Sequence, residues 1–142
     1  MKTTNYYWPL LAALGIGGCA SLDNAMPTTA DEAYRRMTVE SQSDGTMKVS
    51  GPVSFYLQGH EVVAGFKAYV DPKGIEYDFA QAGSGQSVVL PVPRKVMANN
   101  RAKGFGFVFN GETFRFPPAY FEGLMRKVNE VANAKRSGTP VH

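Results

Sequence analysis

Cysteine is almost absent from this sequence, which has only Cys19 in its 142 residues. A single cysteine excludes an intrachain disulfide and a cysteine-based metal cage. Histidine is nearly as scarce: His60 stands in a predicted turn beside Glu61, and His142 is the last residue. Metal ligation and acid–base catalysis need several converging groups. The composition therefore predicts no metal site, no cofactor and no catalytic residues, and we interpret His60 as a solvated turn residue.

Long apolar runs are also lacking. Residues 6–16 form an uncharged stretch of eleven, preceded by the basic residue Lys2. A membrane-spanning helix needs roughly 20 apolar residues, so this stretch is too short to cross a bilayer. Its length and its position near the start are typical of the core of an export signal peptide.

The segment Ile16-Gly17-Gly18-Cys19-Ala20 follows this stretch directly. It resembles the lipobox of bacterial lipoproteins, in which an aliphatic residue and two small residues precede the cysteine. The resemblance implies cleavage before Cys19, diacylglycerol on its thiol, and an anchor that is essentially permanent once two or three chains are attached. Ala20, in place of aspartate at the second mature position, implies the outer membrane. The alternative is a buried N-terminal helix with a chance cysteine.

The domain organisation expected from the sequence is simple. Residues 1–18 form the signal peptide, and residues 19–33 form the lipidated cysteine and a small, polar, flexible tether. Within that tether, Thr29 and Glu32 could also cap a short helix over 31–38. Residues 34–136 form a single domain, and residues 137–142 form a tail.

Alternation of apolar and polar residues predicts the strands. The segments 47–57, 62–70 and 75–79 read as an antiparallel meander, with Pro52 marking an edge or a bulge. Turns are expected at 58–61 and at Asp71-Pro72-Lys73-Gly74. A short edge strand follows at 88–93, and residues 94–100 could form a helical turn.

The strongest local signal is Asn110-Gly111, because this pair favours a type I′ turn. It predicts a hairpin that pairs Phe109 with Glu112, Phe107 with Phe114, and Phe105 with Phe116. A helix should then start at Pro117-Pro118 and run to about 135, with apolar residues at helical spacing. The fold class predicted is α+β: a meander plus a Phe-rich hairpin, packed by a C-terminal amphipathic helix.

Charge is unevenly distributed along the chain. Residues 20–78 hold five basic and nine acidic side chains, whereas residues 79–142 hold nine basic and three acidic. The basic residues Arg94, Lys95, Arg101 and Lys103 lie in a stretch with no acid between Asp78 and Glu112. They could contact phospholipid headgroups, lipopolysaccharide or an acidic partner, or they could form an ordinary solvated surface.

A ribonucleoprotein-like pattern, Lys103-Gly-Phe-Gly-Phe-Val-Phe109, overlaps the hairpin. It lacks one spacer residue, and the chain carries an apparent export signal. We therefore interpret its aromatic residues as sheet core and expect no nucleic-acid partner.

The function that these observations favour is a non-enzymatic envelope lipoprotein that binds or supports an envelope component, such as a protein partner or an assembly. One alternative is a module that binds a small ligand or a lipid between sheet and helix. A second is an enzyme acting on cell-wall polymers, for which the sequence offers no paired polar groups.

Overall fold

An antiparallel sheet of six strands forms one layer of this α+β protein, as the sequence predicts. The structure is a computed structural model that describes residues 26–83, 85–109 and 111–137; the segment predicted to be a signal peptide, Cys19 and most of the predicted tail lie outside them. The sheet order is β1-β2-β4-β5-β6, with β3 also paired to β4. Its strands are β1 (Thr38–Ser41), β2 (Met47–Ser50), β3 (Val53–Leu57), β4 (His60–Asp71), β5 (Gly74–Gly83) and β6 (Gln86–Val92).

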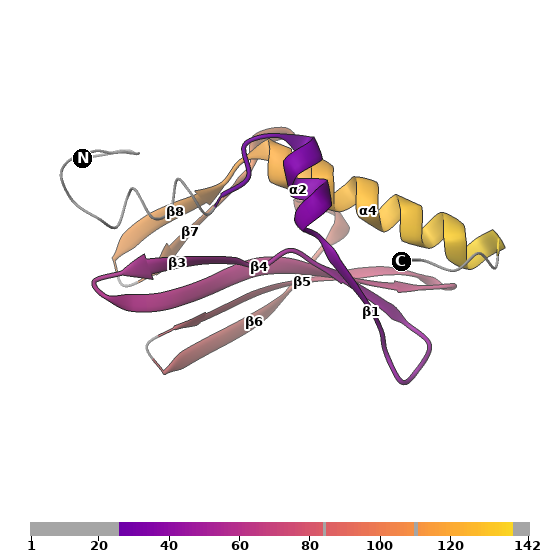
Figure 1. The fold of residues 1–142 in the computed structure, drawn as a ribbon, viewed down its shortest axis with the longest axis horizontal. Helices are drawn as coiled ribbons and strands as arrows, with labels where there is room; N and C mark the ends of the chain where they lie inside the picture. The colour runs from indigo at the N-terminus through magenta and orange to yellow at the C-terminus, as the bar shows by residue number, and fades with distance from the viewer. Residues whose placement is uncertain (1–25, 84, 110, 138–142) are drawn as a thin grey trace.

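The second layer covers one face of the sheet (Figure 1). It contains α4 (Pro118–Ser137), which runs obliquely across the sheet, and the short helix α2 (Ala30–Arg36), which packs on α4. The hairpin of β7 (Phe105–Phe109) and β8 (Glu112–Phe116) forms a separate two-stranded sheet in this layer. The helix α3 (Arg94–Lys103) connects β6 to β7.

The hairpin has the predicted register: Phe105 faces Phe116, Phe107 faces Phe114 and Phe109 faces Glu112. Its inward rings join a core centred on Phe66 of β4. Five aromatic rings lie with their centroids between 4.9 and 6.2 Å from that of Phe66, namely Phe79, Phe105, Phe116, Tyr120 and Phe121. Tilted and edge-on ring pairs of this kind stabilise a core beyond the area that they bury.

The predicted strand 47–57 is interrupted at Gly51 and Pro52, although β2 and β3 keep one register along β4. Ser50 faces Lys67 and Val53 faces Ala64, so two residues are skipped on each strand. A proline there removes a ladder donor, which is why the sequence predicts an edge or a bulge. The register excludes a bulge, because equal numbers of residues are skipped on the two strands, and the proline lies instead in a break of the ladder.

A tyrosine hydroxyl occupies the break. The backbone N–H of Phe66 donates to Tyr120 Oη at 3.1 Å, and that hydroxyl donates to the Gly51 carbonyl at 2.5 Å. Tyr120 is fully buried, and burial raises the pKa of its phenol, so the proton stays on the oxygen. One side chain thus replaces the missing ladder bond and satisfies two buried backbone groups.

Two sequence predictions are corrected here. The tether was expected to extend to residue 33, but Pro27 and Ala33 are buried and residues 30–36 are helical. The helix was expected over 31–38, but it ends at Arg36, and Thr38 begins β1, a strand that the sequence did not predict. The reason is tertiary: Ala33 packs on α4, and Thr38–Ser41 pairs with the full length of β2.

Other boundaries differ by a few residues. The first turn consists of Gln58 and Gly59 alone, with φ angles of 53° and 81°, so β4 begins at His60. Positive φ at both central residues is the type I′ geometry that suits a tight hairpin. Cross-strand pairing likewise lengthens β5 to Gly83 and starts β6 at Gln86.

We predict that Tyr120→Phe lowers the free energy of unfolding by about 1–3 kcal/mol, because it leaves the Phe66 N–H and the Gly51 carbonyl buried without a partner. Urea denaturation followed by circular dichroism measures the change. Tyr56→Phe is the matched control, because Tyr56 is 54% exposed. A Tyr120→Phe protein as stable as this control would contradict the bridging role.

Candidate interaction surfaces

All four basic residues singled out in the sequence lie on α3 and are exposed. Met97 and Asn100 form the buried side of this helix. With 3.6 residues per turn, Lys95 points almost directly away from that side. Arg94 and Arg101 share one flank, two turns apart, and Lys103 lies on the other. The four cations therefore form a ridge along α3, which we call the α3 ridge, and not a single flat face.

The two arginines of the α3 ridge each lie against another element of the fold. Arg101 Nε donates to Glu122 Oε1 at 2.6 Å, and this hydrogen bond lowers the pKa of Glu122. Both side chains are about half exposed, so the pair adds little stability but orients α3 against α4. Arg94 lies beside the start of β5, where its guanidinium is 3.1 Å from the position that a Cβ would occupy on Gly74.

Sequence reasoning missed Arg115, which lies close to the α3 ridge. Its guanidinium donates to the backbone carbonyl of Lys103. Arg115 stands on β8 opposite Gly106, on the outward face of the hairpin. The alternation of Phe114, Arg115 and Phe116 was the signal available in the sequence, because it places Arg115 on the exposed face.

Polar contacts fasten the start of the described chain to α4. Arg126 donates to Asp31, and the Arg126 and Lys127 cations lie 4.7 and 4.3 Å from the centroid of the Tyr34 ring. The Tyr34 hydroxyl in turn donates to Glu130 and lowers the pKa of that carboxyl. We call this set of residues the α2–α4 clasp.

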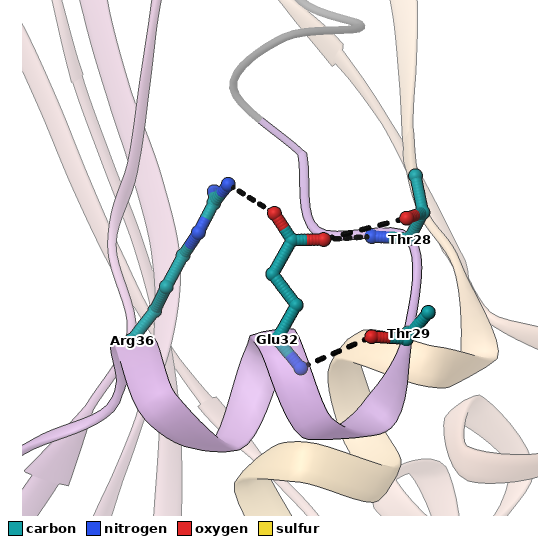
Figure 2. A network of polar contacts seen from close by, with 4 residues as sticks. All are labelled: Thr28, Thr29, Glu32 and Arg36. Atoms are coloured by element: carbon teal, nitrogen blue, oxygen red, sulfur yellow. Dashed lines mark hydrogen bonds and ion pairs between the residues drawn. The ribbon is translucent and has the colours of Figure 1, made fainter.

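The N-terminus of α2 is capped as the sequence predicts. The Thr29 hydroxyl accepts from the Glu32 N–H at 3.1 Å, and the Glu32 carboxylate accepts from the Thr28 N–H at 2.9 Å (Figure 2). The same carboxylate pairs with Arg36 at 2.6 Å. The first bond satisfies a helix donor that has no partner within the helix, and the second holds the residue that precedes the cap.

Close backbone approach makes the clasp possible. A Cβ on Gly123 of α4 would lie 2.4 Å from the Ala33 Cβ and 2.5 Å from the Tyr34 nitrogen. A glycine in mid-helix costs about 1 kcal/mol relative to alanine. This glycine therefore has a packing role, and it allows α2 to lie directly on α4.

The edge strand β6 is the largest exposed apolar feature among the residues that the structure describes. Val88, Val89 and Leu90 are 38%, 58% and 53% exposed. Neighbouring side chains on a strand point to opposite faces. Apolar surface is thus exposed on both faces of this edge.

Two further features concern ligands. A hollow of about 210 Å³ lies between the β4–β5 turn and the end of α4, and its lining includes Lys73, Lys135 and Asp71. The sequence leaves open a ligand site between the sheet and the C-terminal helix, but the rings around Phe66 fill that space. The phenylalanines of the ribonucleoprotein-like pattern, Phe105, Phe107 and Phe109, belong to this same core.

Chemistry-bearing groups are sparse within residues 26–83, 85–109 and 111–137. No cluster of three or more His, Cys, Asp or Glu side chains suited to a metal occurs there. His60 is exposed at the first position of β4. Asn100 is 3% exposed, and its side-chain nitrogen has no hydrogen-bond partner in the described part of the chain. Among the described residues, none of α2, α3 and α4 combines the length and the apolar content of a membrane-spanning helix.

Comparison of the chain with protein-family profiles, with curated proteins and with solved structures gave no match.

We predict that Gly123→Ala loosens α2, because overpacking costs about 1–3 kcal/mol and the gain in helix propensity returns only about 1 kcal/mol. Hydrogen exchange at the Ala33 and Met37 amides, which bond to Thr29 and Tyr34, reports on the helix. Exchange there should rise. Gly106→Ala is the control, since a Cβ on Gly106 has no atom nearer than 3.7 Å. Unchanged exchange in Gly123→Ala would show that α2 does not need this close approach.

Proposed function

We propose that this protein is a non-enzymatic bacterial lipoprotein, cut before Cys19, anchored to the outer membrane by lipid on that cysteine, and bound to another component of the cell envelope. The observation that carries the proposal is the segment Ile16-Gly17-Gly18-Cys19 directly after an uncharged stretch of eleven residues. That order serves export, cleavage and acylation in turn.

Because α2 packs on the folded body, the distance from Cys19 to that body is short. Met26 packs against the core and Pro27 is buried, so only residues 20–25 separate Cys19 from the folded body. At about 3.3–3.6 Å per residue, the seven steps from Cys19 to Met26 span at most about 25 Å. A lipid on Cys19 would therefore hold the folded body close to the headgroups.

The α3 ridge supplies a surface suited to that position. Lys95 points outward and Lys103 lies on the flank opposite the engaged Arg101, with Arg115 nearby. Lysines close to an anionic surface contribute about 1 kcal/mol each. We infer that this ridge contacts anionic headgroups or an acidic partner in the envelope.

The first test is the intact mass of the protein extracted from membranes, compared with Cys19→Ser. We expect the mass of residues 19–142 plus a diacylglyceryl group and an acyl group. The Cys19→Ser protein should lack both groups and leave the membrane fraction. An unmodified 1–142 chain in the soluble fraction of the wild type would refute the anchor.

The second test isolates the surface charge from the anchor, using the full chain with Cys19→Ser and phospholipid vesicles. Lys95→Gln with Lys103→Gln should weaken binding to anionic vesicles by about 30-fold, given about 1 kcal/mol for each lysine. Lys67→Gln is the control, because Lys67 stands on the sheet face opposite the helices, between buried Phe66 and Ala68. Equal weakening in both proteins, or none in either, would argue against a role for the ridge.

A further inference from the structure

The strand β6 has the properties of an open pairing edge. It is the outermost strand beside β5, it is seven residues long, and its sequence Gln-Ser-Val-Val-Leu-Pro-Val carries no charge. A long, uncharged, apolar edge is a template for pairing with another strand, and Pro91 is the one residue of β6 of a kind that opposes such pairing. The opposite edge differs because two short strands share it. One is β1, which has four residues and on which Glu40 pairs with Lys48 of β2 at 3.0 Å, and the other is β3, which has five residues and pairs only with β4.

The register of β6 shows which backbone groups are free for pairing. Gly83 faces Gln86 across a two-residue connection, so these residues form a hydrogen-bonded pair. Bonded and non-bonded pairs alternate along an antiparallel ladder. It follows that Ser87, Val89 and Pro91 direct their backbone groups away from β5. Pro91 has no N–H to donate, but at this position no hydrogen bond between β5 and β6 is lost.

We propose that β6 pairs antiparallel with β6 of a second copy of this chain, centred on Val89. In this register each Val89 N–H donates to the carbonyl of the other copy's Val89. Each Ser87 N–H donates to the carbonyl of the other copy's Pro91, so four hydrogen bonds form. Val88 then faces the other copy's Leu90. Apolar side chains meet along the whole exposed centre, with no charge brought against another.

The geometry of such a pair favours a second copy as the occupant. Two antiparallel edges joined into one continuous sheet are related by a two-fold axis perpendicular to the sheet, which gives a closed dimer. The two α4 helices and both α2 helices then lie on the same side of the joined sheet (Figure 1). Both chain starts can thus reach one membrane, although the pairing itself does not depend on the proposed anchor.

The test uses the full chain with Cys19→Ser, held in detergent, so that acylation cannot affect the result. In this background Val89→Cys introduces the sole thiol. A hydrogen-bonded pair has a Cα–Cα distance of about 5.5 Å, which a disulfide can bridge. Mild oxidation should join most Val89→Cys chains into dimers. Val108→Cys is the control, because Val108 is also an exposed strand valine, at 62%, and it should remain monomeric on a reducing-agent-free gel.

Sedimentation of the Cys19→Ser parent, and of lysine variants made in it, tests whether two chains associate without a disulfide. The parent should have twice the protein mass of one chain. Val89→Lys, which would set two lysines face to face, should be a monomer, whereas Val108→Lys should remain a dimer. A monomeric parent, a dimeric Val89→Lys protein, or equal crosslinking at Val108 would overturn the proposal. A monomeric parent would also leave β6 available to another segment or protein.

Discussion

The hydroxyl of Tyr120 is the contact on which the arrangement of the two layers depends. It takes the place of a direct ladder bond between Gly51 and Phe66, so the sheet can break at Pro52 without leaving a buried group unpaired. Because burial raises the pKa of this phenol, it remains neutral and can donate and accept at once. The same bond fixes the first turn of α4 above Phe66, around whose ring the other aromatic rings gather.

Three nearly adjacent residues of α4 join three other parts of the molecule. Tyr120 enters the sheet, Glu122 binds Arg101 of α3, and Gly123 allows α2 to pack directly against the helix. These contacts differ in kind: a buried hydrogen bond, an exposed ion pair and a close backbone approach. The exposed pair is the weakest of them. The two buried contacts therefore hold these elements together most strongly, and the ion pair sets how α3 is oriented.

Much of this fold could be predicted because its signals are local. The pair Asn110-Gly111 and the alternating phenylalanines predicted the hairpin register, and helical spacing predicted α4. The parts that could not be predicted depend on residues distant in sequence. The extent of α2 depends on Gly123, about 90 residues later, and β1 exists because β2 offers it an edge. At the candidate surface, four exposed cations were recognised, but Arg115 becomes their neighbour only after the hairpin folds back. The proposed lipid site lies outside the described residues.

The acidic and basic residues of the two halves of the sequence lie in different layers of the fold. Alternation along the strands puts Glu40, Glu61, Glu76 and Asp78 on the outer face of the sheet, with only Lys48 and Lys67 of opposite sign. The basic residues of the second half of the chain belong instead to α3, β8 and α4. The described chain begins in this same basic layer, at α2. A lipid on Cys19 and attraction to an anionic surface would then act on the same side of the molecule, and pairing through β6 would preserve that side in both copies. The outer sheet face, acidic and free of helices, would point away from the membrane.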